Sequence, residues 1–497
     1  MSMHRLQNSV LHLARFTLEA QSALSIGSGA NDGVYDHPIV RDANGLPMIP
    51  GTSLAGVLRH LWIANHGGKE AAANALFGYQ RYDKGDASRL EVAACPMQNS
   101  HGQAVEGLVV KQHGLDDPLL KAAQATRDDP LFRDRVRISH RGVAADTGKF
   151  DRGLVLAGTR FCGELRLWSD KTADPDWEAL LALLVDPRLR LGGATRAGLG
   201  AMRLVPESLH CGTFNLRQPE DVRRLQTLAP SLGAHQGLTP TTVKHQPITA
   251  LTTLRLRLTP RDFWRIGQGD GAVNHYDKTP NLLPKTEAKV TWEQHNKGKI
   301  NHQIKYALVP GSAVKGALAH RTAFHFNALS GIFVEDIEES KRATWDKSED
   351  SEAVRALFGF AKNKETAPQR SRAQTGQAGQ VFIDDLHLKL DRPKQQATSL
   401  MHNSIDRFTG GVRNRMLFSE EVLYNTPMEL TITLLPGVAT TDDTTRQALA
   451  RALVDLCAGR LALGGGATKG HGSFSGEPLD ADTRTWLIEQ GEQWPCN

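Results

Sequence analysis

The sequence contains few cysteines, and none are closely paired. Its five cysteines (Cys95, Cys162, Cys211, Cys457 and Cys496) are odd in number, widely spaced and form no C-x-x-C pair. This pattern argues against a disulfide framework and against a thiolate zinc site. We therefore expect a protein of the reducing cytoplasm.

Long hydrophobic runs are also absent. No window approaches the roughly 20 apolar residues of a membrane span, and the first residues lack an apolar run of signal-peptide length. We therefore expect neither membrane insertion nor secretion. The sequence also has no H-E-x-x-H, no G-x-S-x-G and no G-x-x-x-x-G-K-[ST], so metalloprotease, serine hydrolase and P-loop chemistry are poorly supported.

The bulk composition is that of a globular protein with two cores. The chain has 497 residues, of which 40% are hydrophobic and 23% are charged. This length suits two domains of about 200 residues each. A net charge of +5 is too small to identify a nucleic-acid binder. Evidence for nucleic-acid binding must therefore come from local clusters of basic residues.

The sequence repeats itself. Three segments of the first half recur in the same order in the second half: residues 49–60 as 309–320, 76–78 as 357–359, and 191–200 as 463–472. Three collinear matches indicate a duplicated domain. We predict a first domain over 9–208, a linker over 209–249, a second domain over 250–476 and a C-terminal tail over 477–497.

Each copy has the pattern of an α+β module. Alternating strands (Leu254, Leu256, Leu258) precede helices with apolar residues at i, i+3 and i+4, for which Thr52 and Ser312 are predicted N-caps. The order strand, helix, strand, strand, helix, glycine loop, strand is typical of a ferredoxin-like fold. Helices would cover one face of the sheet and leave the other free.

Glycine loops and helix starts could hold phosphates. Arg196 and Lys469 are predicted to stand at corresponding positions in the two glycine loops, where backbone N–H groups can approach a polyanion. The helix starts after Pro50 and Pro310 offer unpaired N–H groups. The alternatives are a tight turn and a well-capped helix.

Basic residues gather ahead of a strand in each copy. They are Arg133, Arg135, Arg137 and Arg141 in the first copy, and Arg407, Arg413 and Arg415 in the second. Such clusters are usually solvated surfaces, but their repetition suits a sugar-phosphate backbone.

Asp36 is the leading catalytic candidate. It lies in a glycine-broken loop between the first strand and the helix, and Tyr276-Asp277 imitates its Tyr35-Asp36 in the second copy. A carboxylate beside RNA can bind Mg²⁺ or position an attacking 2′-hydroxyl. An Asp near a proline is also an ordinary turn former.

The first copy contains the motifs D-x-P-I-V-R-D, I-P-G-T-S-L-A-G-V-L-R-H, L-F-G and G-G-x-T-R-x-G-L-G, and the second contains H-N-S-I-D-R-F-T-G-G-V-R. Together these motifs resemble the RAMP backbone subunits of type III CRISPR effector complexes. The chain is similar to a fusion of two such subunits. The resemblance implies tandem modified ferredoxin-like (RRM-like) domains with inserted thumb hairpins. It also implies three kinds of partner: CRISPR RNA, complementary target RNA and other effector subunits.

In cleaving members of this family, an Asp at the position of Asp36 cuts target RNA with a divalent metal, Mg²⁺ or Mn²⁺. The second copy lacks the P-[IV]-[IV]-[KR]-D continuation and carries an insertion over Val290–Tyr306, so Asp277 matches the pattern only in part. The alternatives are a non-catalytic subunit that binds CRISPR RNA and a guide-processing RAMP nuclease.

The predicted RNA-binding residues follow from these motifs. In the first copy they are Gly51, Thr52, Ser53, Arg59, Arg141, Arg152, Gly192, Gly193 and Arg196; in the second they are Gly311, Ser312, Lys315, Arg407, Arg413, Arg415, Gly465, Gly466 and Lys469.

Overall fold

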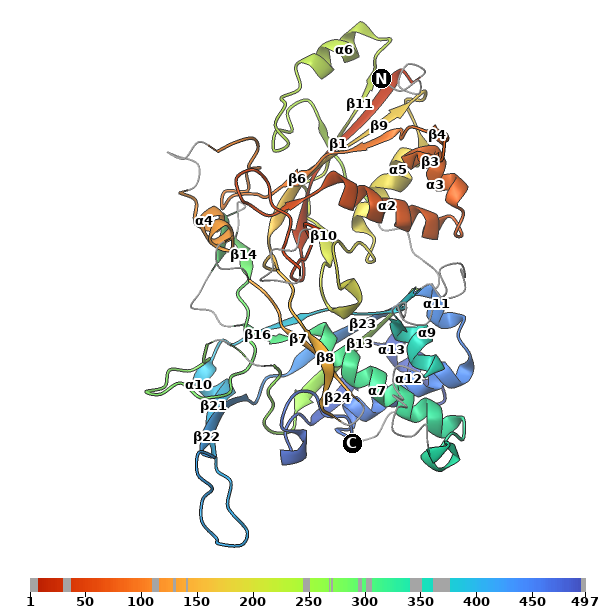
Figure 1. Ribbon diagram of the computed structural model, residues 1–497. Coiled ribbons are helices and arrows are strands. Elements are labelled where there is room, and N and C mark those ends of the chain that lie inside the picture. Colours follow the sequence, from red (N-terminus) through yellow and green to blue (C-terminus); the bar gives the residue numbers. More distant parts are fainter. Residues whose placement is uncertain are drawn as a thin grey trace.

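The chain folds into two modules that lie one above the other (Figure 1). The structure is a computed structural model that describes residues 8–29, 37–109, 116–127, 131–139, 142–244, 251–267, 269, 271–293, 297–300, 306–339, 351–360 and 376–492. In Figure 1 the first module is red to yellow and the second is green to blue.

Both modules contain the same antiparallel sheet. In the first, the strand order is β5 (Leu90–Val92), β9 (Arg160–Ser169), β1 (Val10–Ala20), β10 (Met202–Leu204). In the second it is β19 (Val381–Ile383), β23 (Met428–Leu434), β13 (Thr252–Pro260), β24 (Phe474–Pro478). The helices α2 (Gly51–Asn65) and α5 (Pro175–Ala182), and α7 (Gly311–Leu329) and α12 (Asp443–Cys457), complete each β-α-β-β-α-β chain. This topology confirms the predicted tandem ferredoxin-like fold.

The first helix of each module packs on its sheet as predicted, but the predicted caps are wrong. Leu54, Leu58 and Leu61 are buried in the core of the first module. Pro50 and Pro310, rather than Thr52 and Ser312, occupy the N-cap positions, and neither helix has a side-chain cap. Proline already has the φ that an extended residue ahead of a helix needs, so each helix begins two residues earlier than predicted, at glycine.

The segment predicted as a linker is part of the first module. Strand β11 (His210–Asn215) pairs with β1, and α6 (Pro219–Gln226) and β12 (Thr239–Pro240) follow it. Leu225, Leu228 and Leu238 join Leu13 and Phe214 in a second small core on the far side of the sheet. The described part of 209–249 therefore covers one end of the sheet face that we predicted to be free.

The second module keeps that face open. Along β13, buried leucines alternate with exposed Thr253, Arg255 and Arg257, whereas every residue of β1 is buried. The predicted free face is therefore correct for the second module and wrong for the covered part of the first.

The predicted C-terminal tail also folds. Helix α13 (Ala481–Glu489) is capped by Asp480, and its Leu487 is buried in the second core. Thr483 Oγ1 accepts a hydrogen bond from Arg255 N at 2.8 Å. The described residues 477–492 therefore belong to the second module.

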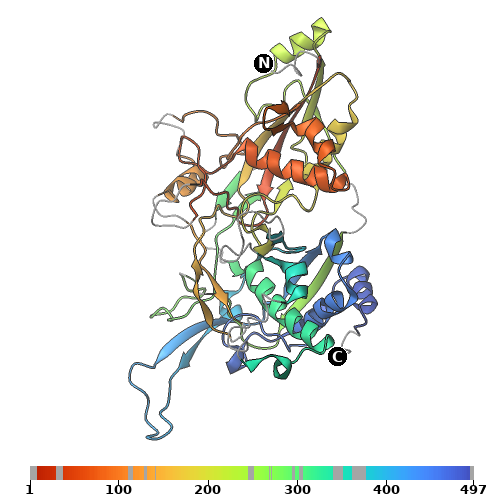
Figure 2. The same cartoon turned by 45° about the vertical axis from the view of Figure 1, so that its right-hand side comes forward.

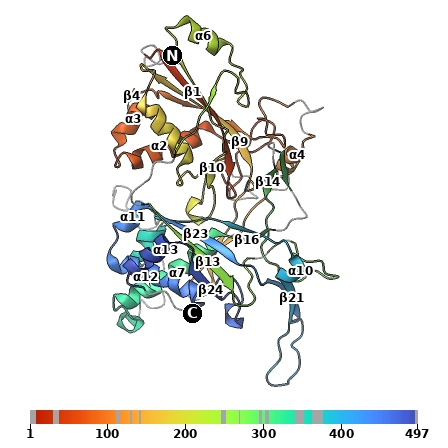
Figure 3. The ribbon, with the colours of Figure 1, turned by 180° about the vertical axis from the view of Figure 1, so that it is seen from behind.

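The predicted insertion reaches back onto the first module. It forms a hairpin of β14 (Val290–Glu293) and β15 (Lys297–Ile300), which lies beside α4 (Pro118–Ala125) in Figures 1 and 3. Trp292 Nε1 donates to Gly158 O at 2.7 Å, and the Arg160 guanidinium lies 4.1 Å from the centre of the Trp292 ring.

Each module also carries a longer hairpin in the place expected for a thumb. In the first module, β7 (Arg135–Ile138) and β8 (Ala144–Phe150) run across the second module beside α7, as Figures 1 and 2 show. In the second module, β21 (Ala397–His402) and β22 (Phe418–Leu423) project away from the body. One thumb is therefore docked and the other is free.

The remaining elements are short. In the first module they include β2 (Met48–Ile49), α3 (Glu70–Phe77), β3 (Tyr79–Arg81), β4 (Lys84–Asp86) and β6 (Cys95–Pro96); in the second, β16 (Tyr306–Val309), α9 (Glu352–Phe358), β17 (Gly359–Phe360), β18 (Gln377–Ala378), β20 (Leu386–Lys389), α10 (Pro393–Gln396) and α11 (Pro436–Ala439). Among the described helices, none has both the length and the apolar composition that crossing a bilayer requires.

Candidate nucleic-acid interface

The two glycine loops have the same backbone geometry. Leu191 N donates to Gly200 O and Leu463 N to Gly472 O, each at 2.9 Å. Each loop contains a 3-10 turn, over Thr195–Ala197 and Ala467–Lys469. Because the loops are equal in length, they align without a gap.

This alignment corrects one prediction. It places Arg196 opposite Thr468, and Lys469 opposite Ala197, so the two cations do not correspond. Sequence comparison had matched G-A-T-R to G-A-T-K, which shifts the loops by one residue.

The first glycine loop binds the second module. The Arg196 guanidinium lies 4.6 Å from the centre of the Phe382 ring, and its Nε donates to Gly379 O at 3.1 Å. Asp385 N donates to Gly198 O at 3.3 Å. Burial and the nearby Arg190 lower the pKa of Arg196. Arg196 is therefore directed at protein.

The start of α7 already holds an anion. Gly311 is buried, and its N–H donates to Asp385 Oδ1 at 2.9 Å. The carboxylate occupies the position at which we predicted a phosphate. Ser312, the next residue, is half-buried.

The start of α2 lacks this carboxylate. A Cβ on Gly51 would overlap Val92 O, just as one on Gly311 would overlap Ile383 O, so Val92 corresponds to Ile383. Two residues on, Ala94 stands where the second module has Asp385. Thr52 is exposed and Ser53 half-buried, while Arg59 donates to Asn74 Oδ1 at 2.5 Å.

A buried ion cluster joins the modules. Arg133 donates through Nε to Glu287 Oε2 at 2.9 Å, and through Nη1 to Asp385. Burial opposes every charge in this cluster, but Arg133 and His387 hold the pKa of Glu287 at about 2, and the two carboxylates raise the pKa of Arg133. Burial raises the pKa of Asp385. Beside this cluster, Arg190 forms an ion pair with Asp384.

Further cations surround this cluster without pairing. Among the described residues, Arg135, Arg152 and Lys315 form no ion pair; Arg135 donates to Ala197 O at 3.2 Å and Lys315 to Phe358 O at 3.0 Å. Burial lowers the pKa of all three, that of Arg135 to about 10, and neighbouring arginines lower the pKa values of Arg135 and Lys315 further.

Cations therefore outnumber carboxylates at the junction. The described cations are Arg133, Arg135, Arg152, Arg190, Arg196 and Lys315, and the described carboxylates are Glu287, Asp384 and Asp385. Uncompensated positive charge of this kind attracts a polyanion.

Asp36 lies outside the described residues, as does Arg141. The residue after Asp36 is described, and His37 O accepts a hydrogen bond from Gly153 N at 3.0 Å. The loop that carries Asp36 therefore ends next to Arg152. A Cβ on Gly193 would overlap the Arg152 guanidinium, so the first glycine loop meets the same point.

The backbone hydrogen bonds that follow the Asp36 loop have counterparts in the second module. Val40 N donates to Ile26 O and Ser28 N to Pro38 O; the counterparts in the second module are Lys285 N to Ile266 O and Gly269 N to Leu283 O. Leu283 thus takes the place of Pro38.

Counting back two residues from Pro38 gives Asp36, and counting back two from Leu283 gives Asn281. The Asn281 side chain accepts from Ser419 N at 2.9 Å. Asp277 is exposed, next to a small polar cavity of about 200 Å³ lined by His275, Lys394 and Ser399.

In the second module, Lys469 lies over the Phe418 ring and 3.7 Å from Glu420, and it is 45% exposed. Gly465 and Gly466 are half-buried at the start of its loop, as Gly193 is in the first; Gly192 is exposed.

The free thumb ends in a basic and apolar tip. Arg407, Arg413 and Arg415 are exposed there, and Phe408 is 99% exposed. The Asp406 carboxylate accepts from Phe408 N and Thr409 N, each at 2.9 Å, which fixes the turn. The tip thus presents a fixed turn with exposed cations.

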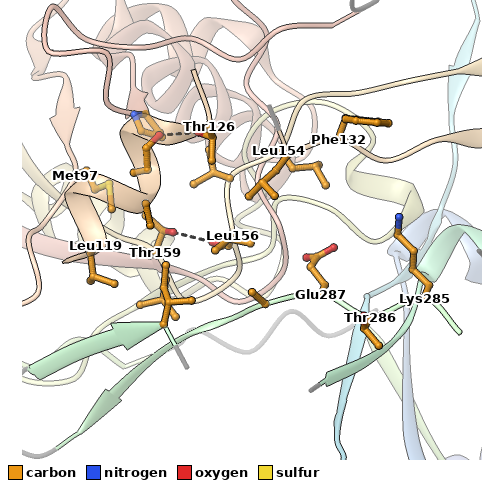
Figure 4. A pocket seen from close by; sticks show the side chains of 18 residues that line it. Met97, Leu119, Thr126, Phe132, Leu154, Leu156, Thr159, Lys285, Thr286 and Glu287 are labelled. Atoms are coloured by element: carbon orange, nitrogen blue, oxygen red, sulfur yellow. Dashed lines mark hydrogen bonds between the residues drawn. The ribbon is translucent and has the colours of Figure 1, made fainter. Parts of the chain in front are cut away.

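A cavity between the modules is a poor site for RNA. It has a volume of about 310 Å³ and lies between the modules, with Leu119 and Leu154 on one side and Lys285 and Glu287 on the other (Figure 4). Lys285 is the only basic residue among the described residues that line it, and Glu287 already binds Arg133.

Sequence reasoning missed the carboxylates of the junction. Glu287, Asp384 and Asp385 meet Arg133 and Arg190 across more than a hundred residues of chain, so no local pattern reports them. One signal was present: the pair Asp384-Asp385 stands where the first copy has Ala93-Ala94.

A family profile described as the RAMP superfamily matches residues 17–203 and 263–475. The chain belongs to the RAMP superfamily. The two matched regions coincide with the two modules, so both are RAMP modules. No curated protein matches the sequence.

One solved structure that matches is a chain from a structure titled as the cryo-EM structure of type III-B Cmr-beta in the apo state. The two chains are 14% identical with a TM-score of 0.29, over 39% of this chain and 96% of that one.

Proposed function

We propose that the chain is a subunit of a type III CRISPR effector complex that binds CRISPR RNA and, through it, complementary target RNA. Membership of the RAMP superfamily in both modules supports the class. The observation that carries RNA binding is the excess of cations at the junction, where Arg135, Arg152 and Lys315 form no ion pair among the described residues. Its partners would be both RNAs and other effector subunits, in the cytoplasm.

We propose further that the subunit cuts the target once, with Asp36 as the catalytic residue. The support is the position of the loop, which ends at the pairing of His37 with Gly153, beside the unpaired cations. Cations there would stabilise the charge that develops on the scissile phosphate. A count of two residues back from the matched Pro38 and Leu283 gives Asn281 in the second module, and an amide cannot act as a base or carry negative charge to a metal.

The expected cofactor is Mg²⁺ or Mn²⁺. A carboxylate oxygen is a donor that these ions prefer, which fits Asp36. Among the described residues, no three His, Cys, Asp or Glu side chains gather as a metal site. When bound, the ion would polarise the phosphate and lower the pKa of a nucleophile.

A purely structural subunit is the second candidate. It is favoured by two predicted RNA grips that are already occupied by protein. Arg196 binds Gly379 of the second module, and the Gly311 N–H binds Asp385 of its own module.

The test uses the assembled effector complex with its guide. A labelled complementary RNA should be cut in Mg²⁺ or Mn²⁺ and remain intact in EDTA, whereas a non-complementary RNA and repeat RNA alone should stay intact in both. If the complex binds the complementary RNA without cutting it, the subunit has the purely structural role. If it cuts repeat RNA alone, the subunit is a guide-processing nuclease.

A further inference from the structure

One position carries opposite charges in the two modules. Leu24 forms a bridge with Val155, and Trp264 with Leu423, in equivalent places ahead of the glycine loops. Three residues before Val155 is Arg152, and three before Leu423 is Glu420. Glu420 therefore corresponds to Arg152.

The neighbouring strand gives a second matched pair. Arg135 pairs with Phe150 across the first thumb, and His402 pairs with Phe418 across the second. Phe150 and Phe418 stand five residues before the bridging positions, so they correspond, and His402 takes the place of Arg135.

In the second module, basic side chains of the same module surround the Glu420 carboxylate. His402 Nε2 lies 2.6 Å from Glu420, Arg265 Nε lies 3.3 Å from it and Lys469 Nζ 3.7 Å. Burial opposes the Glu420 charge, but Arg265, Lys469 and His402 hold its pKa below the ordinary value. A carboxylate that is buried and already surrounded by cations repels a phosphate.

In the first module, the same positions hold two cations. Arg152 Nε is buried and has no acceptor among the described residues, and Arg135 donates only to the carbonyl of Ala197. Burial lowers the pKa of Arg135 most, and Arg133 and Arg152 lower it further, against the opposing effect of Asp385. Partly buried cations that repel one another destabilise the free protein, and an anion placed between them removes that cost.

We infer that Arg135 and Arg152 form a receptor for one phosphate of RNA, at the end of the Asp36 loop, and that the second module has replaced this receptor with the internal His402–Glu420 pair. The identity of the ligand as RNA rests on the proposed function. Gly193 is part of the receptor because its missing side chain lets the loop backbone lie against the Arg152 guanidinium. Both arginines are positioning residues for the phosphate.

The test measures binding of a fluorescein-labelled single-stranded RNA of about 12 nucleotides to the full chain without guide, by anisotropy at several salt concentrations. The double variant Arg135→Gln/Arg152→Gln should bind more weakly, and its plot of log K against log salt should be shallower by roughly 0.7, the value of one phosphate on a single strand. Arg203→Gln is the matched control, because Arg203 is 52% exposed and paired with Glu19.

Thermal melting separates binding from a structural role. The double variant should melt at the same temperature as the wild type or higher, since it removes repulsion. A lower melting temperature, or an unchanged salt slope, would overturn the inference.

A second variant, Arg135→His/Arg152→Glu, copies the pair that already folds in the second module. It should fold and lose the same phosphate; retention of the wild-type slope would contradict the receptor. If the variants lose RNA binding but the wild-type complex does not cut RNA, the receptor is supported and the proposed cleavage is wrong. If the wild-type complex cuts RNA but the variants bind RNA as the wild type does, cleavage is supported and the receptor is wrong.

Discussion

Surfaces that correspond in the two modules carry different residues at the junction between the modules and away from it. Arg133, Arg190 and Arg196 of the first module bind the second, and their counterparts in the second module are Leu400, Ala462 and Thr468. On the receiving side, Asp384 and Asp385 correspond to Ala93 and Ala94. The ionic joint, in which Arg133 and Arg190 bind Glu287, Asp384 and Asp385, therefore has no counterpart among these corresponding residues.

The duplicated modules have kept the same fold but have different charged residues on corresponding surfaces. The core leucines and the glycine geometry recur in both modules, because each sheet must be covered and each loop must turn. The charged residues do not recur, because each now faces a different neighbour.

Removing Arg133 should have the largest effect on stability. The change Arg133→Ala leaves Glu287 and Asp385 buried without their cation, which typically costs about 3–5 kcal/mol. Urea unfolding of the full chain should show this loss, and Arg203→Ala should cost less than about 1 kcal/mol. Equal effects of the two changes would mean that the ion cluster does not hold the joint.

Acid should weaken the joint through Glu287. Its pKa is about 2 in the folded chain against an ordinary 4.5, so its contribution is present above about pH 5 and is lost as the pH falls towards 2. The shift corresponds to about 3 kcal/mol. The stability difference between wild type and Glu287→Gln, measured by urea unfolding, should therefore shrink between pH 6 and pH 3; a constant difference would contradict the pairing.

A pair of matched glycines compares the docked loop with the free one. Gly198 and Gly470 both have positive φ, 104° and 88°, so alanine costs each about 1–2 kcal/mol of backbone strain. At Gly198 the added Cβ would also overlap the Asp385 carboxylate, whereas at Gly470 it meets nothing within 4 Å. Gly198→Ala should therefore be the more destabilising by about 2 kcal/mol in the same unfolding assay. Equal losses would mean that the first loop is not held by the joint.

The smallest effects are expected from the two loop cations. Lys469→Ala removes a cation that is 45% exposed and should flatten the salt dependence of RNA binding by about one phosphate or less. Arg196→Ala should leave that slope unchanged and cost about 1 kcal/mol of stability, since Arg196 packs on Phe382. If Arg196→Ala flattens the salt dependence and Lys469→Ala does not, Arg196 binds RNA as the sequence predicted.

The sequence predicts the doubled module well, because periodic leucines and the three recurring segments are local signals. It fails where contacts join distant residues. The segment 209–249 read as a linker because of Pro240 and its threonines, yet β11 pairs with a strand about two hundred residues earlier. The loop cations were matched by residue type, whereas the hydrogen bonds of Leu191 and Leu463 set the true alignment. Asp277 resembles Asp36 through the Tyr-Asp pair, whereas the hydrogen bond of Gly269 with Leu283 matches Leu283 to Pro38, a correspondence that the sequence does not report.

The central claim is that the two modules have diverged into one that cuts and one that does not. Mapping the cuts in a single end-labelled target RNA, with wild-type complex and the variants Asp36→Asn and Asp277→Asn, tests it most directly. We expect one cut, lost in Asp36→Asn by at least about a hundredfold in rate and kept in Asp277→Asn. A cut that survives Asp36→Asn, or one that disappears with Asp277→Asn, would contradict the account.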